Sequence, residues 1–283
     1  MQQITALKSK LSRANPWLPE TVKVVNCQRE TVDASTITIE IPDGLKMGKA
    51  GQFNMLSVFG IGEIPISISG IDIEKRQLRH SIRGVGAVSK ALMHVSIGDW
   101  IGLRGPFGKQ WPLQKISRKK NVVIIAGGIG LAPVLPIIDK IEKNELKSLQ
   151  TNLLVGIRSP NLRLFPQYLD QLQNINLLES VDIYQEGWKG HVGVVTQLIK
   201  NIENLSPNTL AFICGPEVMM RYCAQELLLH GLKQENIFIS MERHMKCAIG
   251  FCGRCQLMEH FLCKTGPIFS YAQMTEYLNI PYI

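Results

Sequence analysis

The feature that most constrains this chain is a group of four cysteines near its C-terminal end. They are Cys247, Cys252, Cys255 and Cys263, spaced C-x4-C-x2-C-x7-C. Seven cysteines in 283 residues are too few for a disulfide framework of the secreted kind. The clustering therefore predicts reduced thiolates that bind a metal, which favours a cytoplasmic protein.

The spacing separates two kinds of metal centre. Gaps of four and then two residues are typical of plant-type [2Fe-2S] sites, in which glycines such as Gly250 and Gly253 permit a tight loop around the sulfur atoms. The fourth cysteine of such sites normally lies farther along the chain, which leaves the cluster type open. A zinc site with four cysteine ligands is the alternative, although two C-x2-C pairs would then be expected. Cys27, Cys214 and Cys223 are expected to be small buried residues.

The hydrophobic pattern of the rest of the chain changes once, from one typical of strands to one in which strands alternate with helices. Residues 21–112 are short alternating or β-branched runs separated by Pro and Gly turns, which predicts an antiparallel β-barrel with one helix at 87–94. Within residues 113–240 strands alternate with helices, which predicts an α/β domain with a parallel sheet. The polar stretch 108–121 is predicted to be a linker, residues 1–20 a tail, and residues 241–283 a small metal-binding module.

Several local segments follow from this pattern. Apolar periodicity predicts helices running from the glycine-rich turn at 127–130 to Lys143, at 164–172, at 194–202 and at 217–232. The last strand is expected at 236–242. The apolar stretch 122–138 contains glycines and prolines and is too short to cross a bilayer. The first twenty residues lack the apolar core of a secretory signal, so export is not expected.

Charge and composition limit the function only broadly. Lys and Arg number 31 against 23 acidic residues, giving a net charge of +8. A hydrophobic content of 45% excludes a disordered chain. The positive balance is compatible with nucleic acid, with anionic cofactors or with an acidic partner protein.

A glycine-rich turn carries the second functional signal. Gly127, Gly128 and Gly130 follow the apolar strand 122–126 and precede a helix, the context of a dinucleotide-binding turn. Glycines let the backbone approach a pyrophosphate at the start of a helix, and Pro133 replaces the third glycine of the usual fingerprint. The alternative is a tight strand-to-helix turn of any α/β domain.

Arg158 follows the next strand, where an acidic residue would hold the ribose hydroxyls of NAD. An arginine there predicts a contact with a 2′-phosphate and hence a preference for NADP. A solvated loop charge is the alternative interpretation.

The order of these motifs resembles the ferredoxin-NADP reductase superfamily, in its branch with a C-terminal [2Fe-2S] module. The resemblance rests on the barrel, the glycine turn, Cys214-Gly215-Pro216 and the four late cysteines. That branch includes electron-transfer subunits of dihydroorotate dehydrogenase, B subunits of anaerobic sulfite reductase and gamma subunits of NAD(P)-linked [NiFe] hydrogenases. The runs at 105–108, 111–112 and 240–247 look most like the hydrogenase gamma subunits.

The resemblance implies an FAD bound by the barrel. The family's flavin motif falls on Pro65, Ile66 and Ser67, but Ile64 stands where the family has an arginine. Arg83 is expected to supply the missing charge. The turn that follows it would bind the FAD pyrophosphate through Gly86, Val88 and Ser89.

The resemblance also places residues near the redox centres. Cys214, Gly215 and Pro216 would border the nicotinamide, and Glu242 would lie between the flavin and the cluster. No side chain is required as a catalytic acid or base, because the cofactors carry the electrons.

The function that this implies is a diaphorase. Hydride would pass between NAD(P)(H) and FAD, and single electrons between FAD and a [2Fe-2S] cluster, in a multi-subunit [NiFe] hydrogenase with further iron-sulfur and catalytic subunits. One alternative replaces the hydrogenase by dihydroorotate dehydrogenase or sulfite reductase. A zinc-stabilised nucleic-acid-binding protein is disfavoured by the 7% aromatic content. Neither nucleic-acid binding nor membrane insertion is expected.

Overall fold

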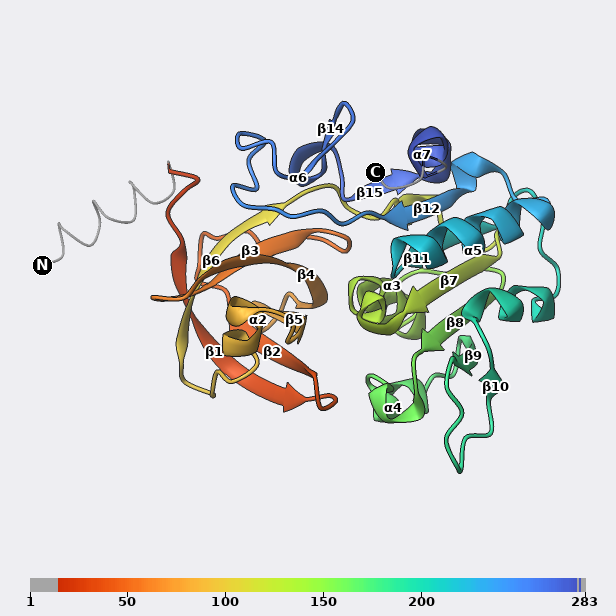
Figure 1. Cartoon of the computed structure of the whole chain (residues 1–283), viewed down its shortest axis with the longest axis horizontal. Helices are drawn as coiled ribbons and strands as arrows, with labels where there is room; N and C mark the ends of the chain where they lie inside the picture. The colour runs from red at the N-terminus through yellow and green to blue at the C-terminus, as the bar shows by residue number, and fades with distance from the viewer. Residues whose placement is uncertain (1–14, 279, 281–283) are drawn as a thin grey trace, which may run out of the picture.

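The computed structural model describes residues 15–278 and residue 280. A barrel and an α/β domain lie side by side, and the C-terminal segment runs over the barrel before it returns to the α/β domain (Figure 1). Most of the predicted N-terminal tail lies outside the described residues. No helix in the described part of the chain has the length and apolar character needed to cross a bilayer.

Six antiparallel strands close the barrel in the order β1-β2-β5-β4-β3-β6. They are β1 (Glu20–Arg29), β2 (Ala34–Glu40), β3 (Phe53–Val58), β4 (Gly62–Asp72), β5 (Gln77–Arg83) and β6 (Trp100–Phe107). Alternate residues of these strands, such as Val22, Val24, Ile37 and Ile39, fill the interior. The predicted barrel is confirmed, and helix α2 (Ala87–Leu92) forms where a helix was expected.

The α/β domain is built on a seven-stranded sheet of order β10-β9-β8-β7-β11-β12-β15. Its strands are β7 (Val122–Gly127), β8 (Thr151–Ile157), β9 (Asn176–Val181), β10 (His191–Val192), β11 (Leu210–Cys214), β12 (Ile237–Ser240) and β15 (Ile268–Ser270). β7 and β11 are buried along their whole length, as expected for parallel strands covered on both faces. The predicted fold class is confirmed.

Two predicted helices differ from the observed ones. The helix after the glycine turn is divided into a 3-10 segment, η2 (Gly128–Val134), and α3 (Leu135–Glu142). Pro133 and Pro136 lack the N–H group that a continuous α-helix needs there. The helix predicted at 164–172 shortens to α4 (Pro166–Leu169), because Phe165 adopts a left-handed conformation and the N–H groups of residues 173 and 174 bond to Glu142.

The other connections are short. They are η1 (Leu113–Lys115), η3 (Pro160–Leu162), η5 (Gln234–Asn236) and η4 (Val195–Asn201), a 3-10 helix within the segment predicted as helix at 194–202. Helix α5 (Glu217–Leu229) begins where predicted but ends before the predicted end at residue 232, and it buries Cys223, as expected.

The C-terminal segment is not a separate appendage. It contains β13 (Gln256–Leu257), β14 (His260–Phe261), α6 (Leu262–Thr265) and α7 (Tyr271–Leu278). β12 was expected to be the last strand, but β15 pairs with it in antiparallel fashion, with Ser240 opposite Ile268. The cysteine loop therefore starts and ends on neighbouring strands of one sheet.

The predicted linker at 108–121 contains a buried anchor. Trp111 is 1% exposed, and its indole Nε1–H donates to the Pro133 carbonyl at 3.0 Å. Its ring meets the Phe212 ring edge-on at 5.7 Å, and its backbone N–H donates to Ala50 in the barrel domain. The sequence pattern showed the polar residues of this stretch but not the buried side chain that contacts both domains.

Replacing Trp111 with phenylalanine tests this anchor. We expect Trp111→Phe to lower the free energy of unfolding by about 1–3 kcal/mol, because it leaves the buried Pro133 carbonyl without a donor and removes packed volume. Urea denaturation measures the change. Trp100→Phe, at a position 58% exposed, is the control and should change stability by less than about 0.5 kcal/mol. Equal effects of the two substitutions would contradict the anchor.

Candidate functional site

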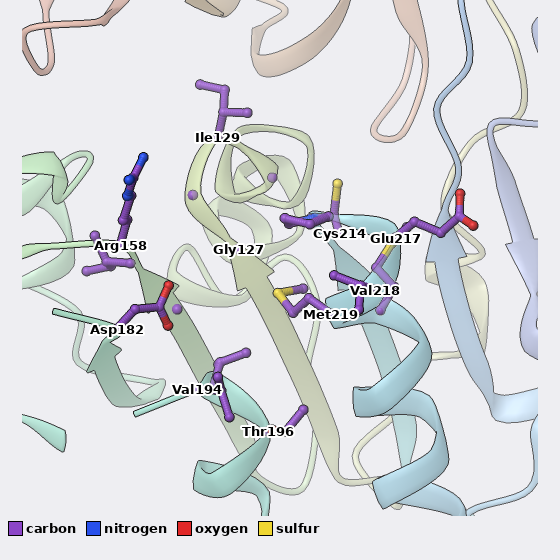
Figure 2. Close-up of a pocket in the computed structure, with 18 of the residues that line it drawn as sticks. Gly127, Ile129, Arg158, Asp182, Val194, Thr196, Cys214, Glu217, Val218 and Met219 are labelled. Carbon is purple, nitrogen blue, oxygen red and sulfur yellow. The ribbon is translucent and has the colours of Figure 1, made fainter. Parts of the chain in front are cut away.

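A cavity of about 1240 Å³ opens at the carboxyl ends of the parallel strands, facing the barrel. The carboxyl edge of such a sheet is where α/β domains bind their ligands. The cavity brings together these residues predicted from the sequence: Arg83, Gly127, Gly128, Gly130, Arg158, Cys214, Gly215, Pro216 and Glu242. Figure 2 shows Arg158 and Asp182 at one end, Gly127 near the middle, and Cys214 with Glu217 at the other end.

The glycines of the turn have different roles. Gly128 has a φ of +53°, and a Cβ added there would meet nothing within 4 Å, so its backbone is open to the cavity. A Cβ on Gly130 would lie 2.4 Å from the Cys214 carbonyl oxygen and 2.7 Å from the Gly215 nitrogen. Gly130 is therefore required because the glycine turn packs against the turn at Cys214 and Gly215. The backbone of Gly128, in contrast, is free to approach a phosphate. The sequence alone assigned all of them to the ligand.

Cys214 ends β11 at the floor of this cavity. Its side chain is buried, as expected, and burial raises the pKa of the thiol, with a further contribution from the nearby Glu242 carboxylate. Glu242 opens onto the cavity, but desolvation by the surrounding protein raises the pKa of its carboxyl. The Cys214 thiol is thus neutral at physiological pH, which fits a packing role beside a ring better than a nucleophile's role.

Arg158 and Asp182 form the charged end of the cavity. Arg158 directly follows β8 and Asp182 directly follows β9, and the sheet register pairs the preceding residues, Ile157 and Val181. Arg158 is exposed, as a residue that meets a phosphate would be. Sequence reasoning missed Asp182, because its place at a strand end appears only once β9 is located at 176–181.

Arg83 reaches the cavity from the barrel. Its Nε donates to Asp33 Oδ2 at 2.7 Å. Burial would raise the pKa of Asp33, but hydrogen bonds from Thr31 and Arg83 hold it below its ordinary value. Asp33 and Thr31 line the cavity and were not predicted. The only signal that could have found them is their position in the β1–β2 turn, opposite the start of the parallel sheet.

The other predicted flavin residues lie on the barrel, outside the residues that line this cavity. Pro65, Ile66 and Ser67 belong to β4 and are half-buried. The buried His80 ring holds this strand, with Nδ1 3.0 Å from the Ser67 carbonyl oxygen, and burial lowers the pKa of His80 to about 4. The imidazole is therefore neutral at physiological pH and acts as a structural hydrogen-bonding group.

The turn before α2 completes the barrel face. The Ser89 hydroxyl accepts hydrogen bonds from the N–H groups of Val85 at 3.0 Å and Gly86 at 2.9 Å, so it is already engaged within the turn. The first N–H groups of a helix have no acceptor within the helix, which here concerns Ala87 and Val88. A half-buried strand next to helix N–H groups that lack an intrahelical acceptor is compatible with a flavin ring and its pyrophosphate. The individual flavin contacts stay predictions.

The four late cysteines form two pairs. Cys247 Sγ accepts hydrogen bonds from the backbone N–H groups of Phe251 at 3.3 Å and Cys252 at 3.4 Å, and also contacts the Cys252 thiol. Burial alone would raise the pKa of Cys247, but these N–H groups and that of Ile249 lower it to about 7. Cys263 lies against Cys255 and accepts a hydrogen bond from the Gly250 N–H at 3.2 Å.

This pairing bears on the kind of metal centre. A four-cysteine zinc site needs all its sulfurs around one ion, whereas a [2Fe-2S] cluster needs two protein sulfurs at each iron. Two pairs in a loop whose amides point at sulfur therefore fit the iron-sulfur cluster. Cys252 is exposed, and the other three are buried.

Fold and site together define a two-domain nucleotide-cofactor reductase with an added thiolate loop. Residues 124–225 match the oxidoreductase NAD-binding domain family, and residues 242–275 match the iron-sulfur cluster binding domain of dihydroorotate dehydrogenase B.

Known proteins extend these matches over most of the chain. Sulfhydrogenase 2 subunit gamma of Pyrococcus furiosus is 34% identical over 79% of this chain and 83% of its own. A protein of Methanocaldococcus jannaschii named "Probable dihydroorotate dehydrogenase B (NAD(+)), electron transfer subunit" is 32% identical over 78% and 79%. A solved chain from an NADH-dependent reduced ferredoxin-NADP oxidoreductase shares the fold, with a TM-score of 0.74, 24% identity and coverage of 89% and 88%.

The chain therefore belongs to the ferredoxin-NADP reductase superfamily, in the branch with a C-terminal iron-sulfur binding domain. It is a flavoprotein NAD(P)H oxidoreductase and an electron-transfer subunit, whose cofactors are FAD, NAD(P) and an iron-sulfur cluster. The resemblance inferred from the sequence is confirmed.

The close contact at Gly130 generates a stability prediction. We expect Gly130→Ala to lower the free energy of unfolding by about 1–3 kcal/mol, because the added methyl group collides with backbone atoms that cannot move independently. Thermal unfolding of the purified protein measures the loss. Gly86→Ala is the control, because Gly86 has a φ of −131° and open space around its Cβ direction. Equal midpoints for the two variants would show that the turns do not pack as described.

Proposed function

We propose that this chain is the diaphorase subunit of a multi-subunit [NiFe] hydrogenase. The observation that carries the proposal is the arrangement of three sites in one chain: the cavity at the sheet edge, the barrel face, and the paired cysteines above the barrel. The likeness to sulfhydrogenase gamma subunits supports a hydrogenase as the assembly.

The cavity residues divide the work of binding NAD(P). We propose that Gly127 and Gly128 hold the pyrophosphate through their backbone, and that Cys214-Gly215-Pro216 borders the nicotinamide. Arg158 and Asp182 then meet the adenosine ribose. The arginine favours a 2′-phosphate, and the carboxylate favours free ribose hydroxyls, so the balance between them sets the coenzyme preference.

The barrel would hold FAD through Pro65, Ile66, Ser67, Arg83, Gly86, Val88 and Ser89. When bound, FAD accepts a hydride from a nicotinamide and releases electrons singly, which is what coupling a nicotinamide to an iron-sulfur cluster requires. The side chains around it align and shield the reactants. The neutral Cys214 thiol would lie beside the nicotinamide, and Glu242 would lie on the side toward the cysteine loop.

The cluster would be held by Cys247 with Cys252 at one iron and by Cys255 with Cys263 at the other. Residues 251–254 are the exposed side of this loop. We propose that electrons pass there between the chain and its partner subunits, which carry further iron-sulfur centres and the hydrogen-converting site. We propose a cytoplasmic setting, because thiolates that hold an iron-sulfur cluster need a reducing compartment.

A second assembly is favoured by one specific observation. The cysteine segment matches the iron-sulfur domain of dihydroorotate dehydrogenase B, and several relatives are named as electron-transfer subunits of that enzyme. The same residues would serve in that complex, and only the partner chain would differ.

Coenzyme choice can be tested at the charged end of the cavity. We expect Arg158→Ala to lower kcat/KM for NADPH by about ten-fold and to leave that for NADH nearly unchanged, because it removes a charged hydrogen bond to the 2′-phosphate. Asp182→Asn should shift the NADPH-to-NADH ratio in the opposite direction. Arg118→Ala, an exposed arginine away from this cavity, is the control. A ratio unchanged in both cavity variants would discard the assignment.

The partner can be identified by anaerobic purification from the native cell. We expect the chain to co-purify, at fixed stoichiometry, with a subunit that binds nickel, and the complex to couple hydrogen oxidation to NAD(P)+ reduction. Mass spectrometry of the companion chains and metal analysis measure this. A companion that oxidises dihydroorotate would contradict the hydrogenase assignment and establish the second one.

A further inference from the structure

A buried arginine joins the barrel to the cysteine loop. Arg104 lies near the end of β6, and its side chain is 4% exposed. Its Nε and one terminal nitrogen donate to the two carboxylate oxygens of Glu63 on β4, at 2.8 and 2.5 Å. An arginine carries five N–H donors in a rigid planar fork, so this pairing uses one edge and leaves the rest for other acceptors.

The remaining donors reach two other segments of the chain. The second terminal nitrogen donates to the carbonyl oxygens of Pro16, at 2.7 Å, and of Cys247, at 3.1 Å. The carbonyl of Lys246 is a more distant acceptor at 3.5 Å. One guanidinium thus connects two barrel strands, the segment before β1 and the backbone at the first cysteine.

The Pro16 contact holds a second side of the same loop. Trp17, the next residue, meets Phe251 edge-on, with ring centroids 5.8 Å apart and planes at 90°. Phe251 precedes Cys252 and is 79% exposed. The cysteine loop is therefore held at Cys247 directly and at Phe251 through the segment that Arg104 anchors.

Burial makes this arrangement costly to disturb. A buried guanidinium is tolerated only when it is paired and hydrogen-bonded. Removing either the guanidinium or its carboxylate leaves the remaining buried group without a hydrogen-bond partner. Groups that hold a metal ligand from behind fix the geometry of the centre and tune its properties. Arg104 occupies that position at the carbonyl of Cys247.

We propose that Arg104 is a positioning residue that clamps the first cysteine of the iron-sulfur loop to the flavin barrel and so fixes the placement of the cluster relative to the flavin. This inference rests on the proposed function, because it assumes a cluster on the four cysteines. Arg104 touches no reacting atom; it acts through the backbone of Cys247.

Arg104→Lys tests the clamp, because lysine keeps the charge but cannot make the forked contacts. In the full chain, purified anaerobically, we expect this variant to lose iron to a chelator about 10- to 100-fold faster than wild type and to give a broadened EPR signal of the reduced cluster. Reduction of the bound flavin by NAD(P)H, followed by its absorbance, should remain within about two-fold of wild type.

Arg76→Lys is the matched control. Arg76 lies in the same barrel and donates to the carbonyls of Ile41, Pro42 and Leu45, but it has no contact with the cysteine loop. Its variant should keep wild-type iron release and the wild-type EPR signal. Unchanged iron release and EPR in Arg104→Lys would overturn the clamp while the proposed function stands. A wild-type chain without iron would instead overturn the proposed function.

Glu63→Gln keeps the inference testable if Arg104→Lys folds poorly, as judged by circular dichroism against Arg76→Lys. It preserves side-chain size and leaves the guanidinium without its anion. We expect this variant to lose iron to a chelator about 10-fold faster than wild type, because the guanidinium loses the carboxylate that holds it at the Cys247 carbonyl. Iron release and an EPR signal equal to those of wild type would overturn the clamp.

Discussion

The antiparallel pairing of β15 with β12 is the constraint on which the placement of the redox sites depends. Ser240 lies opposite Ile268, so the segment that carries the cysteines must leave the sheet and return to the strand beside the one it left. The returning chain is also bound to the barrel domain, because the Lys109 N–H donates to the Gly266 carbonyl at 2.6 Å. Because both of its ends are fixed, the loop can adopt few conformations, and it lies over the barrel (Figure 1).

Direct packing holds the two domains in one arrangement. Phe53 and Met55 of the barrel share a buried cluster with Cys255 and Cys263. On another side, Arg79 of β5 donates to Asp139 of α3 at 2.7 Å, and the same carboxylate accepts a hydrogen bond from Tyr168 at 2.6 Å. Burial, followed by the nearby Asp139 charge, raises the pKa of Tyr168, so the phenol remains a donor at physiological pH. These contacts fix how the sheet-edge cavity faces the barrel.

Much of this architecture could be predicted from the sequence, because it depends on local patterns. Alternating runs predict the barrel, and the charge-free strand before Gly127 predicts the nucleotide-binding domain. The spacing of the four cysteines predicts a metal centre. What the sequence could not supply depends on contacts between distant segments. Neither the pairing of Cys255 with Cys263 nor the return of β15 to the sheet follows from a local rule.

The same distinction explains the missed site residues. Asp182 is one of many acidic residues until the end of β9 is known, and Asp33 gains its role only through Arg83, fifty positions away. The glycine turn shows a packing role that the motif alone did not indicate, while the assignment of its glycines to the ligand stays a prediction. Gly130 packs against the backbone of Cys214, which leaves no room for a side chain and which is not part of the motif.

If FAD is the obligatory link between NAD(P)H and the four-cysteine cluster, removal of the flavin must stop electron transfer from NAD(P)H to the cluster. NAD(P)H is added anaerobically to the complete protein, to the same protein stripped of FAD, and to the stripped protein after FAD is restored, and the cluster is followed by EPR. We expect a reduced-cluster signal in the first and third samples and none in the second. A signal of equal size without flavin, or no signal in any sample, would contradict this role of FAD.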